Sequence, residues 1–325
     1  MRTLAIILTA AVVAASASEA KVTRYLTGNA ADVNPPLFGP AHDLGGGSTD
    51  VDAGIQYLID QARGCTACAT KVDVVILRST GADGYNDYIF AMNGVDSVET
   101  LVITRASDSN TAAVETTVKN AEVVFYAGGD QCDYVKYFKG TKVETATESV
   151  YARGGGIGGT SAGTAIQGEF TYDACTGSAT SADALSNPYH RRISFTYGFF
   201  NWAHLNDVIT DDHFQQRDRM GRLMSFLARQ IKDGQATTAL GLAANEVTSV
   251  VIDKNGLATV LGDGPAYFVH ATHVPETCVA GTPLTYSNFL VCRVTSGGTY
   301  DLVTRPTSGC YSISVNAGVL SGNPY

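Results

Sequence analysis

The chain has 325 residues, of which 45% are hydrophobic, so it is long enough to form one large domain with a buried core. Its 22 basic and 31 acidic residues give a formal net charge of -9. No basic block occurs anywhere, which excludes a protein that recognises nucleic acid through its phosphates.

The N-terminus has the pattern of a secretory signal peptide. Arg2 supplies a positive charge, residues 4–15 form a short apolar run, and Ala15-Ser16-Ala17 or Ser18-Glu19-Ala20 offers a cleavage site of small residues. The apolar run is too short to span a bilayer. We therefore predict a secreted protein with no membrane segment, in which residues 1–20 are removed by cleavage near residues 17–20.

The next part of the chain alternates between strand and helix patterns. Residues 21–44 contain three prolines and read as an irregular lead-in after one short strand. The predicted strands are 72–77, 98–104 and 122–127, and the predicted helices are 55–62, 85–92, 111–120 and 132–138. This alternation predicts an α/β fold with a doubly wound, mostly parallel sheet and helices on both faces.

The second half is less regular. Residues 171–200 are predicted to form an inserted loop near the site, and residues 216–232 a helix with Leu223 and Phe226 on its apolar face. Further strands are predicted at 208–210, 239–244 and 247–253, and a hairpin at 289–295 and 299–305. We expect one α/β domain over 21–275 and a cysteine-containing β extension over 276–325.

The chain has seven cysteines, and an odd number leaves at least one without an intramolecular partner. Cys65 and Cys68 are predicted to form a small structural bridge, while Cys278, Cys292 and Cys310 are predicted to staple the tail. No second C-x-x-C pair accompanies the first, so no zinc or other metal is expected.

Residues 159–163, Gly-Thr-Ser-Ala-Gly, match the G-x-S-x-G motif of a nucleophile elbow. Such a turn exposes a serine hydroxyl between a strand and a helix, and its glycines avoid backbone clashes. The motif predicts Ser161 as a nucleophile, although a flexible surface turn with this sequence also arises by chance.

A serine nucleophile needs a histidine base and an acid that orients it. His213 is the best of six histidines because it follows a predicted strand. Glu246 is an isolated acid in an apolar stretch, where burial requires a partner. Asp211 and Asp212 are the alternative acids, but they lie beside His213 in the sequence.

Four patches of the sequence, in this order, resemble the cyanophycinase-like serine peptidases, a group that includes aspartyl dipeptidases. They are Gly128-Gly129-Asp130-Gln131, the elbow, Asp211-Asp212-His213-Phe214 with three following arginines, and residues 241–246. The resemblance implies a class I glutamine amidotransferase-like fold and a Ser161, His213 and Glu246 triad. It also implies an oxyanion hole at Gly129 and Ala162, and substrate contacts from Asp130, Gln131, Asp211, Asp212 and Arg217.

The resemblance further implies cleavage of peptide or isopeptide bonds at aspartyl residues, as in cyanophycin or β-aspartyl dipeptides, with no cofactor. This chain has Asp212 where the family usually has glutamine and Asn245 where it has aspartate, which leaves the substrate subsite open. Arg217 and Arg219 cannot share a helix face, so at least one is expected to point inward to an acid. An esterase with the same elbow, a catalytically silent binding protein, and a homodimer stay open.

Overall fold

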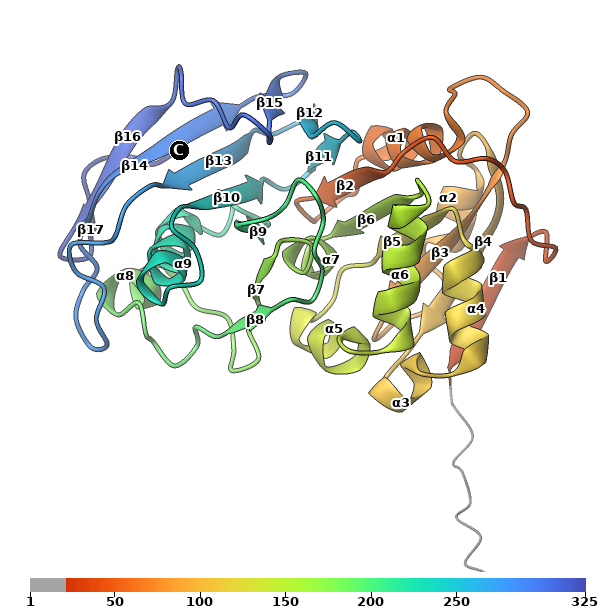
Figure 1. Ribbon diagram of the computed structural model, residues 1–325, viewed down its shortest axis with the longest axis horizontal. Helices are drawn as coiled ribbons and strands as arrows, with labels where there is room; N and C mark the ends of the chain where they lie inside the picture. The colour runs from red at the N-terminus through yellow and green to blue at the C-terminus, as the bar shows by residue number, and fades with distance from the viewer. Residues whose placement is uncertain (1–21) are drawn as a thin grey trace, which may run out of the picture.

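The computed structural model describes residues 22–325, so the predicted signal peptide lies outside the described residues. The chain forms two mixed β-sheets with helices packed around them (Figure 1). A single doubly wound sheet was predicted, and the second sheet is the main departure from that prediction. No helix in residues 22–325 combines the length and apolar character needed to cross a membrane.

The first sheet has nine strands, in the order β1-β4-β3-β5-β6-β2-β11-β12-β15. The run β4-β3-β5-β6-β2 is parallel throughout, as the alternation of strands and helices predicts. The bounds of its nine strands are β1 Thr23–Gly28, β2 Ala41–Gly45, β3 Val72–Arg78, β4 Val95–Val102, β5 Val123–Tyr126, β6 Gly156–Thr160, β11 Thr248–Ile252, β12 Leu257–Gly262 and β15 Thr299–Asp301.

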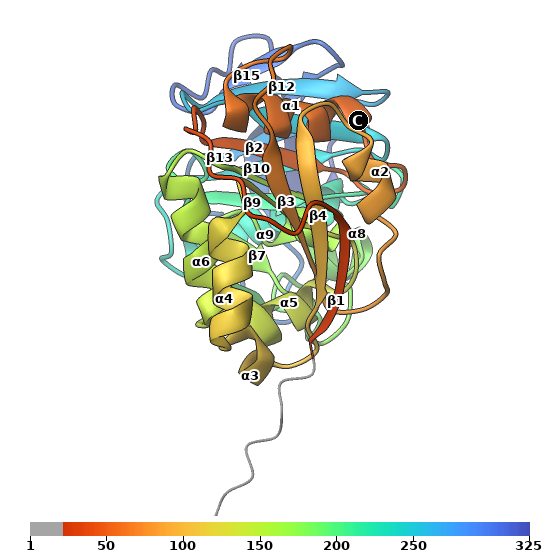
Figure 2. The same cartoon turned by 90° about the vertical axis from the view of Figure 1, so that its right-hand side faces the viewer.

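Helices cover both faces of the parallel part, as predicted. Alternate residues of β3 point to opposite faces. Val74 and Ile76 share a core cluster with residues of α1 and α2, whereas Val75 and Leu77 share another with residues of α4 and α6. Figure 2 shows α4 and α6 on one side of these strands and α2 on the other. The helix bounds here are α1 Asp52–Arg63, α2 Asn86–Phe90, α3 Ala106–Ser109, α4 Ala112–Asn120, α5 Gln131–Phe138 and α6 Lys142–Ala152.

The second sheet has eight strands in the order β17-β16-β14-β13-β10-β9-β7-β8, and only β10-β9-β7 are parallel. Leu240 and Phe268 on one face belong to the core cluster of the first sheet, and Tyr267 and Val269 on the other face pack with α8 and α9. The bounds are β7 Phe170–Tyr172, β8 Phe195–Tyr197, β9 Val208–Asp211, β10 Ala239–Ala244, β13 Ala266–Ala271, β14 Tyr286–Val294, β16 Tyr311–Asn316, β17 Val319–Leu320, α7 Ala162–Ala165, α8 Ser181–Ser186 and α9 Met220–Lys232.

Several predicted elements differ from the structure. The lead-in contains β2, which pairs with β6 and β11 in the interior of the first sheet. Helix α6 was not predicted, because its sequence KVETATESVYA is mostly polar and has few apolar positions. Helix α9 begins at Met220 and not at residue 216, although its predicted apolar positions are buried.

The predicted tail hairpin is wrong. Strand β14 pairs with β13 and β16, while β15 pairs with β12 in the other sheet. The turn between them bonds to β12, because Gly297 N–H donates to the carbonyl of Val260. The tail residues therefore belong to both sheets.

Three disulfides are present, Cys65–Cys68, Cys132–Cys175 and Cys292–Cys310. The pairing of Val291 with Tyr311 brings Cys292 and Cys310 next to each other. Cys278 is a buried free thiol, so its predicted part in stapling the tail is wrong.

Candidate active site

The candidate site lies where the two sheets meet, at the carboxyl ends of three strands. Ser161 directly follows β6 of the first sheet and precedes α7. His213 follows β9 and Glu246 follows β10, both strands of the second sheet. Ligands bind beyond the carboxyl ends of strands in α/β folds, so this location suits a catalytic site.

The backbone at Ser161 has the sharp turn that the motif predicts. Its φ is 52° and its ψ is -116°, a conformation that side-chain-bearing residues rarely adopt. A Cβ on Gly163 would lie 2.0 Å from the carbonyl oxygen of Tyr126, and one on Gly159 would lie 2.6 Å from the backbone of Gly163. Gly159 is therefore needed for strand β6 to pack this closely on helix α7, and Gly163 for α7 to pack this closely on strand β5.

A chain of two hydrogen bonds joins the serine, the histidine and the acid. Ser161 Oγ lies 2.9 Å from His213 Nε2, and His213 Nδ1 lies 2.7 Å from Glu246 Oε1. Since an ionised carboxylate only accepts, the proton belongs on Nδ1, which leaves Nε2 free to accept from the serine hydroxyl. The arrangement can carry a proton away from Ser161 Oγ.

The surroundings of Glu246 differ from the prediction. Its side chain is 28% exposed, so burial does not explain its need for a partner. Glu246 lies in the turn between β10 and β11, and its backbone N–H donates to Gln216 Oε1 over 3.1 Å. This bond fixes the backbone from which the carboxylate reaches His213.

A glycine loop over residues 45–47, which no sequence motif assigned to the site, contacts His213. The backbone N–H of His213 donates to the carbonyl of Gly46 over 2.7 Å. A Cβ on Gly47 would lie 2.4 Å from the imidazole ring. Gly45 accepts the backbone N–H of Ser161, so the same loop also supports the elbow. The sequence feature that could have indicated this loop is the run of three consecutive glycines, residues 45–47, before helix α1.

The carboxylates of Asp211 and Asp212 form ion pairs with arginines. Arg222 Nε donates to Asp211 Oδ2 over 2.9 Å, and Arg219 Nη1 donates to Asp212 Oδ1 over the same distance. Asp212 Oδ1 is also 3.6 Å from His213 Nε2, the nitrogen that faces the serine. Neither acid is bonded to Nδ1. Arg219 is the predicted inward arginine.

A cavity of about 300 Å³ opens beside Ser161. Gly129, Asp130, Gln131, Asp212 and Arg217 line it, as expected for residues that contact substrate. The prediction of a loop over residues 171–200 is wrong in part, because this stretch contains α8, β8 and the end of β7. The irregular part between β7 and α8 does line the cavity, through residues 174, 177 and 178. Asp211 does not line the cavity; it is buried and holds the two arginines.

The predicted oxyanion residues come from two segments of the chain, the elbow and the turn between β5 and α5. Ala162 is the first residue of α7 and is 2% exposed. Gly129 lies in the turn before α5, where Asp130 Oδ1 accepts the backbone N–H of Cys132 over 2.8 Å and caps the helix.

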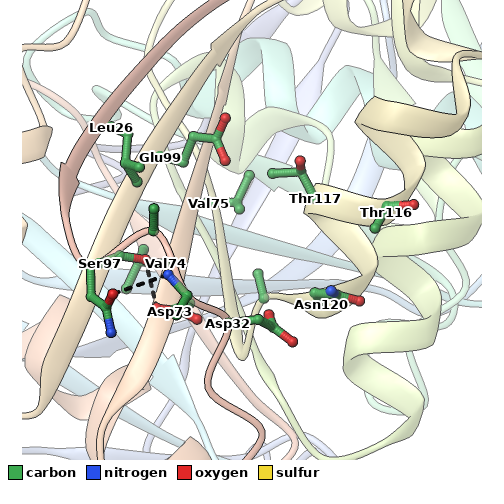
Figure 3. Close-up of a pocket in the computed structure, with 14 residues that line it drawn as sticks. Leu26, Asp32, Asp73, Val74, Val75, Ser97, Glu99, Thr116, Thr117 and Asn120 are labelled. Atoms are coloured by element: carbon green, nitrogen blue, oxygen red, sulfur yellow. Dashed lines mark hydrogen bonds between the residues drawn. The ribbon is translucent and has the colours of Figure 1, made fainter.

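A second, smaller cavity of about 170 Å³ lies away from this site, between β1, β3, β4 and α4 (Figure 3). Asp73 in its wall already accepts hydrogen bonds from Ser97 Oγ at 2.6 Å and from the N–H of Val33. Glu99 is bonded to Arg24. These acids have internal partners, and none of the triad candidates lines this cavity. Within residues 22–325, no cluster of three or more histidines, cysteines or acids is arranged to hold a metal ion.

Comparison with known proteins identifies relatives over most of the chain. Residues 87–259 match the family model described as Peptidase family S51. A cyanophycinase of Nostoc sp. is 30% identical over 251 residues, which cover 74% of this chain and 78% of the relative. A cyanophycinase of Synechococcus elongatus is 26% identical over 269 residues, covering 80% and 78%.

The fold also has a counterpart among solved structures. The crystal structure of a peptidase from an acI-B1 Actinobacterium matches with a TM-score of 0.56 at 14% identity, covering 82% of this chain and 98% of that one. At this identity the match concerns the fold alone.

Proposed function

Because this chain belongs to peptidase family S51 and is a serine peptidase, we propose that Ser161 is its nucleophile, His213 its general base and Glu246 the acid that orients the base. The hydrogen-bonded series from Ser161 Oγ through His213 to Glu246 Oε1 is the observation that carries this proposal. The rare backbone conformation of Ser161 supports it further, because strain of this kind gathers at functional sites.

The proposed reaction begins with attack of Ser161 Oγ on a peptide or isopeptide carbonyl. His213 Nε2 takes the hydroxyl proton, and Glu246 stabilises the imidazolium through Nδ1. His213 then protonates the leaving amine, and an acyl-enzyme remains on Ser161. A water molecule, activated by the same histidine, releases the acid product. The residues need no metal or cofactor for these steps.

The backbone N–H groups of Gly129 and Ala162 are proposed to hold the oxyanion. Ala162 is the first residue of a helix, and N–H groups in a first helical turn have no partner within the helix. Gly129 lines the cavity that Ser161 also lines. Donors fixed in advance by the fold stabilise the developing charge without reorganising.

The charges around the cavity support a substrate with an aspartyl carboxylate. Arg219 is used by Asp211 and Asp212, whereas Arg217 is exposed and takes part in no ion pair among the described residues. Arg217 is therefore the cation available for a substrate carboxylate, with Gln131 as a neutral partner. Asp130 is exposed on the same cavity and suits a cationic group of the substrate.

We accordingly propose cyanophycin or β-aspartyl dipeptides as substrates, and the relatives named cyanophycinase support the first of these. The test is incubation of the protein with cyanophycin and with β-Asp-Arg, with the products read by mass. A matched β-linked dipeptide whose free α-carboxylate is converted into the amide tests the carboxylate. If the protein cleaves simple esters but none of these peptides, the result would favour the esterase alternative. If it cleaves neither, the result would favour the silent binding protein.

The three disulfides support secretion, because such bonds persist in oxidising compartments. N-terminal sequencing of protein recovered from the culture medium tests the cleavage near residues 17–20. The homodimer stays a prediction.

A further inference from the structure

The disulfide between Cys132 and Cys175 joins two segments that line the cavity beside Ser161. Cys132 lies in the first turn of α5, directly after the lining residues 129–131. Cys175 lies in the segment 173–180 that follows β7, between the lining residues Ala174 and Gly177. The two α-carbons are 4.9 Å apart.

These segments are attached to different halves of the molecule. Helix α5 follows β5 of the first sheet, whereas segment 173–180 follows β7 of the second. The segment is bonded on its own side: Arg222 Nη1 donates to Ser178 Oγ over 3.2 Å, and Thr176 Oγ1 donates to the carbonyl of Arg191 over 2.6 Å.

Among the described residues, these two segments make no polar contact with each other. Within the described part of the chain, no hydrogen bond or ion pair connects residues 128–138 with residues 173–180. The Cys132–Cys175 bond is thus the one direct bond that fixes these two walls of the cavity relative to each other.

We propose that the Cys132–Cys175 disulfide is a positioning group for the substrate, and that its reduction lets the segment 173–180 move relative to helix α5 and weakens peptide binding. The inference rests on the proposed function. Reduction by a dithiol converts the bond into two thiols: the dithiol gives up two electrons and two protons and becomes a cyclic disulfide. Residue 175 is exposed, so a reductant can approach the sulfur pair from that side.

The other two disulfides provide matched controls. Cys292–Cys310 joins β14 to the residue before β16, and Cys65–Cys68 closes a short turn after α1. Neither lines the cavity. Removing either of these disulfides takes away a covalent constraint on the fold but leaves the segments that line the cavity linked to each other.

The test compares the oxidised protein, the dithiothreitol-reduced protein, the double variant Cys132→Ser/Cys175→Ser and the control Cys292→Ser/Cys310→Ser. Each is assayed for hydrolysis of β-Asp-Arg and for labelling of Ser161 by a small fluorophosphonate, which needs the nucleophile but little of the cavity. We expect reduction or the first double variant to lower kcat/KM by at least about tenfold, mainly through a higher KM. The reason is that the cavity walls no longer hold the substrate in a fixed position relative to Ser161. Labelling should change little, and reoxidation should restore KM.

An unchanged KM in protein whose thiols at 132 and 175 are verified by mass would overturn the inference. So would an equal loss in the Cys292→Ser/Cys310→Ser variant, or a parallel loss of labelling and of the circular dichroism signal, because both outcomes mean general destabilisation. If the first double variant does not fold, the reduced wild-type protein supplies the measurement. Absence of labelling in the oxidised protein would instead refute the proposed function, and this inference with it.

Discussion

Replacing Glu246 by glutamine removes the charge behind His213 while keeping the size of the side chain. The carboxylate accepts from Nδ1–H over 2.7 Å, so it fixes the tautomer that leaves Nε2 unprotonated toward Ser161. It also stabilises the imidazolium that forms during the reaction. Neutralising a triad acid costs up to about four orders of magnitude in kcat, or about 5 kcal/mol of barrier. Because the Glu246 side chain is 28% exposed, water can screen part of its charge. We therefore expect a loss of about two to three orders of magnitude.

The assay is kcat for β-Asp-Arg in the variants Glu246→Gln and Asp212→Asn, with folding checked by circular dichroism. Asp212 is the matched control, because it is the other acid beside the imidazole and its Oδ1 lies 3.6 Å from Nε2 instead of near Nδ1. Arg219 keeps partners in that control, since it also donates to the Asp212 carbonyl and to Asp211. Near-full activity of Glu246→Gln combined with an inactive Asp212→Asn would refute the assignment of Glu246.

Three further outcomes are expected. Gly163→Ala should lower the free energy of unfolding by about 1–3 kcal/mol or prevent folding, because the new Cβ would lie 2.0 Å from the carbonyl of Tyr126; urea unfolding measures this. Burial raises the pKa of Asp43 to about 7, so the folded state binds this proton more tightly than the unfolded state. Protonated Asp43 therefore contributes to the free energy of unfolding at low pH, and this contribution is lost as pH rises from about 4 to about 7, by at most about 4 kcal/mol. Urea unfolding of Asp43→Asn over this pH range should show no such decline. A decline of equal size in the variant would contradict the role of Asp43. Burial also raises the pKa of the Cys278 thiol to about 11, so a thiol reagent should find no reactive cysteine in the folded, unreduced protein and one after denaturation.

The positions of the proposed site residues at strand ends were more predictable from the sequence than the fold around them. Ser161 lies in a motif whose spacing dictates a turn, and His213 and Glu246 each follow an apolar strand pattern, so their positions at strand ends could be anticipated. The contribution of Gly46 and Gly47 could not be anticipated, because it depends on a contact with His213, which is more than 160 residues away in the sequence.

The second sheet escaped prediction for a physical reason. Strands buried on both faces carry the same apolar pattern whichever sheet they join, so residues 239–244 and 248–252 read alike although β10 and β11 belong to different sheets. Pairing partners are set by packing over long sequence distances, as in the pairing of β15 with β12 instead of β14. The pairing of Cys132 with Cys175 has the same origin, since 43 residues separate the two.

The central claim is that Ser161 is the nucleophile. Its most direct test is the rate of β-Asp-Arg hydrolysis by Ser161→Ala, together with a mass search for an acyl-enzyme in the wild-type protein. Alanine has the same backbone preferences at this φ of 52° as serine, so the variant should fold normally. We expect a loss of several orders of magnitude in kcat and an acyl group on Ser161 alone. Retained hydrolysis in Ser161→Ala, or acylation of Thr160 or Thr164 in its place, would contradict it.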